Sequence, residues 1–143
     1  MNQEQKDQYF MQKALQEAKF AFEKNEVPVG AIVVSNDKII ARCHNLTETL
    51  NDVTAHAEMQ AITSASNHIG GKYLNDCTMY VTLEPCQMCI RDRVYGASDP
   101  HRGYKLLGTK IHPKTKVTSG VMSKECKLLI DAFFIKKRKE KGN

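Results

Sequence analysis

Two short polar motifs restrict the folds that this chain can adopt, because their residue types suit one shared site. In the first motif, Glu58 follows His56 by two positions. The second motif is Pro85 followed by Cys86 and Cys89. Imidazole nitrogens and thiolates are preferred zinc ligands, and catalytic zinc sites commonly use three protein ligands and one open position. The motifs therefore predict that the fold brings His56, Cys86 and Cys89 together around a zinc ion.

Glu58 is a carboxylate that this ligand set does not use. Zinc lowers the pKa of a water in its open position to about 7, and a nearby carboxylate can act as general acid and base, which contributes about 10²–10⁴-fold. The combined pattern resembles the signature of zinc deaminases that act on nucleobases. The alternative is a closed structural site with Glu58 as a solvated helix charge. Such sites normally need four protein ligands, and no fourth Cys or His has matching spacing.

Length and composition bound the remaining possibilities. The 143 residues are expected to form a single domain spanning residues 1–143. No apolar run approaches the roughly 18 residues of a membrane span, and the N-terminal residues lack the apolar core of a secretion signal. Five cysteines is an odd number. Cys43, Cys77 and Cys126 are expected to be ordinary core residues, which suits a reducing, cytoplasmic location.

The net charge of +5 is unevenly distributed along the chain. Residues 1–58 carry six Lys and Arg against nine Asp and Glu, whereas residues 59–143 carry fifteen against seven. The basic residues concentrate in segments 101–116 and 136–141. A solvated surface with a basic tail would explain either cluster alone. Beside a base-deaminase signature, a nucleic-acid partner is the favoured interpretation.

Apolar periodicity predicts alternating helices and strands. Residues 3–24 have the spacing of a helix, and residues 29–35 and 38–43 that of two strands joined by a turn. Thr54 is a predicted N-cap of a helix that runs to about residue 67 and holds His56 and Glu58 in its first turn. Further strands are expected at 78–83, 93–97 and 116–119.

Two more helices complete the predicted order. One would begin at Pro85, a residue favoured at the first helical position. The other would be capped by Ser123 and would contain the apolar residues Leu128, Leu129, Ala132, Phe133 and Ile135. Strands alternating with helices predict an α/β fold.

The chain resembles the cytidine deaminase-like superfamily and, within it, the bacterial tRNA-specific adenosine deaminases, which convert the wobble adenosine of an anticodon to inosine. Segments 27–31, 54–58, 80–86 and 119–121 carry much of the resemblance, together with residues 88–89, 95–97, 125–126, 131 and 133–134. The resemblance implies a three-layer α/β/α fold, with a central mixed sheet of about five strands and helices on both faces. It also implies that the protein is a homodimer and binds a tRNA anticodon stem-loop. No association with a membrane is expected.

The resemblance also implies roles for individual residues. His56, Cys86 and Cys89 would bind Zn²⁺, and Glu58 would be the catalytic acid and base. Asn45 and Asp99 match residues near the bound nucleoside, although each could equally shape its own loop. Phe133 and Phe134 match a C-terminal helix that grips the anticodon loop. All of these are assignments by position.

The chain departs from the family pattern after Cys89. Family members have roughly two more helical turns there, about eight residues, whereas only residues 90–92 precede the predicted strand at 93. Residues 88–93 read like a translated transposon-end adapter, which suggests the hypothesis that foreign sequence replaced this helix. The shortened helix leaves two alternatives open beside a tRNA adenosine deaminase. One is a free nucleobase or nucleotide deaminase of the guanine or cytosine type, and the other is a tRNA-binding zinc protein without activity.

Overall fold

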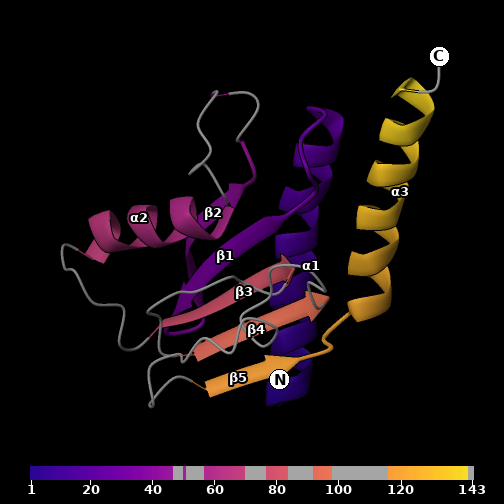
Figure 1. Ribbon diagram of the computed structural model, residues 1–143. Helices are drawn as coiled ribbons and strands as arrows, with labels where there is room; N and C mark the ends of the chain where they lie inside the picture. Colours follow the sequence, from indigo (N-terminus) through magenta and orange to yellow (C-terminus); the bar gives the residue numbers. More distant parts are fainter. Residues whose placement is uncertain (47–49, 51–56, 70–76, 84–91, 98–115, 142–143) are drawn as a thin grey trace.

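The computed structural model describes residues 1–46, 50, 57–69, 77–83, 92–97 and 116–141 (Figure 1). None of the helices in these ranges is both long and apolar enough to cross a membrane. The elements follow one another along the chain as α1 (Gln3–Glu23), β1 (Gly30–Ser35), β2 (Lys38–His44), α2 (Ala57–Ile69), β3 (Cys77–Leu83), β4 (Asp92–Ala97), β5 (Lys116–Ser119) and α3 (Ser123–Lys141).

The strands form one mixed sheet in the order β2-β1-β3-β4-β5. β1 is antiparallel to both of its neighbours, while β3, β4 and β5 run parallel. The predicted turn between β1 and β2 is confirmed at Asn36 and Asp37, whose φ angles are 52° and 62°. Positive φ at both central residues is typical of the tight hairpin turns whose twist matches that of the strands.

α1 begins at a capping box and packs along one face of the sheet. The side chain of Asn2 accepts a hydrogen bond from the Gln5 N–H, and the Gln5 side chain accepts one from the Asn2 N–H. This reciprocal pair satisfies two backbone donors that a helix start otherwise leaves open. Phe10, Met11 and Ala14 then meet Ile32, Val34 and Tyr80 of the sheet in one buried cluster.

Gly30 allows α1 to lie unusually close to β1. A β-carbon at this position would stand 2.0 Å from the Ala14 carbonyl oxygen and 2.5 Å from the Ala18 nitrogen. Both atoms belong to the helix backbone, so no rotamer change could relieve the overlap. The contact between the end of α1 and the start of β1 therefore requires glycine.

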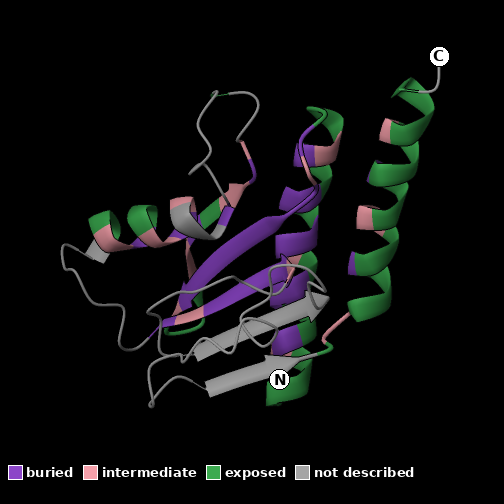
Figure 2. Cartoon of the chain, in the orientation of Figure 1, coloured by how far each residue is buried: buried purple, intermediate pink, exposed green. Residues whose placement is uncertain are grey.

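α2 covers the opposite face with a row of small side chains. Ala57, Ala61 and Ala65 recur every four residues, are fully buried, and pack with Val33 and Val81 in a second cluster. The buried strands β1 and β3 thus lie between α2 on one side and α1 on the other (Figure 2). The predicted α/β architecture, with a mixed sheet and helices on both faces, is confirmed.

α3 packs on the α1 side of the sheet through part of its apolar residues. Cys126 and Phe133 are buried, and Leu129 packs against the α1 cluster. Leu128 is 61% exposed and Ile135 46% exposed, so these two apolar side chains lie outside the buried face. The two side chains lie seven residues apart on one outward stripe, because two helical turns return to the same side.

Candidate active site

Four chain segments meet at one end of the sheet (Figure 1). Gly30, the first residue of β1, pairs with His44, the last residue of β2. The Gly30 N–H also donates to the buried Thr82 Oγ1 at 3.1 Å, near the end of β3. Gln60, in the first turn of α2, donates from Nε2 to the His44 carbonyl oxygen at 2.9 Å. The start of α2 and the ends of β2 and β3 are therefore held together.

Two of these segments, the start of α2 and the end of β3, lead directly into the two sequence motifs. Glu58 is the second residue of α2, and Leu83, the last residue of β3, lies three residues before Cys86. His56, Cys86, Cys89 and Asp99 lie outside the described residues, as does Thr54; of Glu58 the structure describes the backbone. The expectation that Glu58 lies in the first turn of a helix is confirmed.

Asn45 directly follows β2 at this end of the sheet and is 5% exposed. Its N–H donates to the Val29 carbonyl oxygen at 3.0 Å. Asn45 follows His44, whose carbonyl oxygen accepts from Gln60 of α2. The structure thus brings Asn45 and the helix that carries Glu58 to the same place.

His44 is held by a polar network that links β2 to α1. Its Nδ1 lies 3.2 Å from Glu17 Oε1, and its Nε2 lies 3.1 Å from Lys24 Nζ. Because a lysine ammonium only donates, Nε2 acts as the acceptor and the Nδ1–H donates to Glu17. Arg42 adds a second cation, with its Nε 3.5 Å from Glu17 Oε2. The network anchors the residue immediately before Asn45.

The three cysteines outside the second motif, Cys43, Cys77 and Cys126, are free thiols that are at least partly buried. Burial, with a smaller contribution from the Glu17 charge, raises the pKa of the Cys43 thiol. Burial, followed by the Glu125 charge, raises the pKa of Cys126 to about 12. Cys77 is buried as well. The described residues contain no group of three His, Cys, Asp or Glu able to hold a metal.

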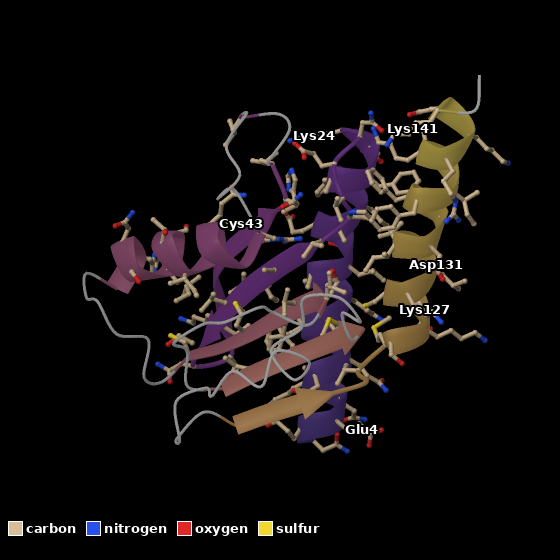
Figure 3. All side chains as sticks on the ribbon, viewed as in Figure 1. Glu4, Lys24, Cys43, Lys127, Asp131 and Lys141 are labelled. Atoms are coloured by element: carbon tan, nitrogen blue, oxygen red, sulfur yellow. The ribbon has the colours of Figure 1, made fainter. Side chains whose placement is uncertain are left out.

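An aromatic and basic cluster adjoins the site. We define the α1–α3 end as Phe22, Phe133, Phe134, Lys136 and Lys137. The buried Phe133 ring makes edge-on contacts with Phe22 and Phe134, at 6.1 and 5.4 Å between ring centroids. Phe134 itself is 46% exposed. Lys136 lies over the Phe22 ring and Lys137 over the Phe133 ring, at 5.5 and 5.7 Å. Lys24 and Lys141 mark the same end of the molecule in Figure 3.

Sequence reasoning did not single out Gln60, Thr82 or Glu17. Each makes a contact with a residue far away in the chain: Gln60 with His44, Thr82 with Gly30 and Glu17 with His44. The only available signal was position, since Gln60 follows Glu58 by two residues and Thr82 is the polar residue of a buried strand. Such a signal marks a candidate and does not identify its partner.

Comparison with known proteins agrees with this geometry. The chain is 42% identical to the tRNA-specific adenosine deaminase of Bacillus subtilis, over 94% of this chain and 92% of that protein. A structure from a study of A-to-I editing by tRNA:A34 deaminases at the wobble position is 40% identical with a TM-score of 0.77, covering 85% of this chain and 98% of that one. Guanine deaminase from Bacillus subtilis is 34% identical with a TM-score of 0.60, covering 68% and 66%.

The alignment lengths and the matched family complete the comparison. The alignment with the Bacillus subtilis adenosine deaminase runs over 149 residues, more than the 143 of this chain. That relative therefore has residues that this chain lacks. The family model of the cytidine and deoxycytidylate deaminase zinc-binding region matches residues 4–94, which is more than half of the chain. The chain belongs to the cytidine and deoxycytidylate deaminase zinc-binding family.

Proposed function

We propose that this protein is a zinc-dependent tRNA adenosine deaminase that converts the wobble adenosine of an anticodon to inosine. The proposal places this activity in one cytoplasmic domain, residues 1–143, that works as a homodimer. One observation carries it: the ends of β2 and β3 and the start of α2, which lead to Asn45 and to both motifs, are joined by hydrogen bonds at one end of the sheet. The adenosine deaminases among its relatives favour this substrate over others in the family.

The residues of the two motifs fit zinc by their donor chemistry. One imidazole and two thiolates form a three-ligand set, supplied by His56, Cys86 and Cys89. When bound there, zinc would supply Lewis acidity that activates water at neutral pH.

Glu58 and Asn45 would divide the remaining chemistry between them. Glu58 would take a proton from the attacking water and return protons to the ring nitrogen and the departing ammonia. Asn45, held through its N–H by Val29, would orient the nucleoside. A well-oriented substrate lowers the barrier because the entropy of alignment has already been lost on binding.

The α1–α3 end is suited to single-stranded RNA. Phe134 is 46% exposed and offers a ring on which an unstacked base can stack. The buried Phe133 ring contacts it edge-on. Lys136 and Lys137, with basic neighbours up to residue 141, provide phosphate contacts, which weaken as salt rises. Lys24 connects this end to His44 and so to the candidate active site. An anticodon loop could reach both at once.

The decisive experiment is one deamination assay. Purified zinc-loaded protein is incubated with an anticodon stem-loop carrying a wobble adenosine, and inosine is measured by mass spectrometry, with free adenosine, cytidine and guanine in parallel. We expect inosine in the stem-loop alone. Turnover of free guanine without turnover of RNA would instead support a nucleobase deaminase, as the 34% identical guanine deaminase suggests. RNA binding with zinc bound and no ammonia release would support an inactive RNA-binding protein.

Glu58→Gln tests the assigned acid and base in the same assay. Amide nitrogen cannot shuttle protons, so we expect inosine formation to fall by about 10²–10⁴-fold. Zinc content should stay equal to that of the unmodified protein, because Glu58 is not one of the three proposed ligands. Full activity of this variant would remove Glu58 from the mechanism.

A further inference from the structure

The peptide unit between His44 and Asn45 is hydrogen-bonded on both of its polar groups, by two different elements. Its carbonyl oxygen accepts from Gln60 Nε2 at 2.9 Å, and its N–H donates to the Val29 carbonyl oxygen at 3.0 Å. Both bonds are near the preferred length for N–H···O pairs. The plane of this peptide sets the direction in which Asn45 leaves the end of β2.

The two partners come from opposite sides of the peptide. Val29 leads into β1, which lies between β2 and β3 in the sheet, whereas Gln60 lies on α2, the helix that packs on one sheet face through Ala57 and Ala61. Gln60 is partly buried and follows Glu58 by two residues in the same helical turn. A displacement of α2 relative to β2 would therefore break the Gln60 bond first.

We propose that Gln60 is a positioning residue that couples the helix carrying Glu58 to Asn45, and so sets the orientation of the nucleoside relative to the catalytic acid and base. This inference rests on the proposed function. Gln60 itself would not touch the substrate; it would act through the His44–Asn45 peptide. The expected consequence of losing it is a misoriented substrate, which lowers kcat more than it raises KM.

Gln60→Met tests the coupling, because methionine keeps the length of the side chain and removes the donor. Losing one hydrogen bond of ordinary strength predicts about a three- to tenfold fall in kcat with KM nearly unchanged. Asn67→Met is the matched control: an exposed polar residue on the same helix, expected to leave both constants unchanged. Equal effects of the two variants would overturn the proposal.

A double-mutant cycle separates positioning from general stability. If Gln60 acts through Asn45, then Gln60→Met should cost nothing further in an Asn45→Ala background, whereas independent roles would add. Additive losses would overturn the coupling. A uniform fall of activity explained by less folded or less zinc-loaded protein would overturn it as well.

Hydrogen exchange tests whether Gln60 holds the His44–Asn45 peptide in place, and the measurement does not require catalytic activity. In Gln60→Met the Asn45 amide should exchange about three- to tenfold faster, because the peptide has lost one of its two bonds, while the Val33 amide in β1 should be unaffected. An unchanged Asn45 amide would overturn the proposal. If the wild-type protein forms no inosine, the proposed function is wrong. The exchange rates would still report whether Gln60 holds this peptide.

Discussion

The antiparallel half of the sheet, β2-β1-β3, and the parallel half, β3-β4-β5, depend on very different connections. β1 and β2 are joined by a two-residue turn with positive φ angles, and their pairing follows from it. β3 and β4 pair in parallel from Thr78 with Asp92 to Leu83 with Ala97. The chain must therefore run back along the sheet within residues 84–91.

That return is short for a parallel crossover. Pairing from Thr78 to Leu83 spans about 17 Å at the rise of a strand, whereas eight helical residues would rise only about 12 Å. Crossovers that include a helix usually need at least about 10–12 residues. The same short segment carries Cys86 and Cys89. The comparison shows that the Glu58 backbone belongs to a helix packed on the antiparallel half, whereas the proposed zinc ligands Cys86 and Cys89 belong to the short connection within the parallel half.

Gly30→Ala should be the largest disturbance of the antiparallel half. The new β-carbon would overlap backbone atoms of α1 at 2.0 and 2.5 Å, so the helix has to move, at a cost of about 3 kcal/mol or more. Chemical denaturation measures the loss. Gly120→Ala is the control, since its β-carbon meets nothing within 4 Å and φ is 85°; backbone strain there should cost only about 1 kcal/mol. Equal losses would mean that close packing against α1 is not what Gly30 provides.

Thr82→Val should weaken the same half by less. Valine keeps the shape of threonine, and it leaves the Gly30 N–H without its buried acceptor at the end of β3. An unsatisfied buried donor costs about 1–3 kcal/mol. The Gly30 amide should then exchange faster with solvent, as measured by NMR. If the stability of Thr82→Val matches that of the unmodified protein, this bond does not join β1 to β3.

Lengthening the crossover should strengthen the parallel half alone. Seven helix-forming residues inserted after Cys89 add about two turns and should raise stability by about 1–2 kcal/mol, the effect of burying one apolar side chain. The Val94 and Tyr95 amides of β4 should exchange more slowly, while those of β1 stay the same. A Gly-Ser insert of equal length separates chain length from helix formation. Unchanged β4 exchange with both inserts would mean that the connection does not limit this pairing.

Stability should also fall at alkaline pH. Burial raises the pKa of Cys126 to about 12, whereas an unfolded thiol ionises near pH 8.5. The folded state then binds the proton more tightly, so its contribution is complete below about pH 8.5 and is lost as the pH rises toward 12. Cys126→Ala should flatten this slope in denaturation curves from pH 8 to 10.5. Cys126 packs with Phe10 and Tyr80, and a slope that persists in Cys126→Ala would show that this thiol is not its source.

Local patterns in the sequence predicted most elements to within a residue or two. α1 was expected at 3–24 and is observed at 3–23, and β2 was expected at 38–43 and is observed at 38–44. Caps, turns and periodicity act over a few residues, so they can be read directly. Contacts such as Gln60 with His44 depend on how the layers stack, and no local pattern contains that information. The same limit explains Leu128 and Ile135: helical spacing groups apolar residues without saying which group meets the sheet.

The alanine row of α2 has a consequence for engineering. Ala57, Ala61 and Ala65 have no exposed surface, and a methyl group is the smallest side chain that still packs, so the axis of α2 sits at its nearest approach to the strands. Any larger residue at these positions would push α2 away from the strands and displace the Glu58 backbone with it. Redesign of substrate preference should therefore leave these three alanines in place and vary the rim around Asn45.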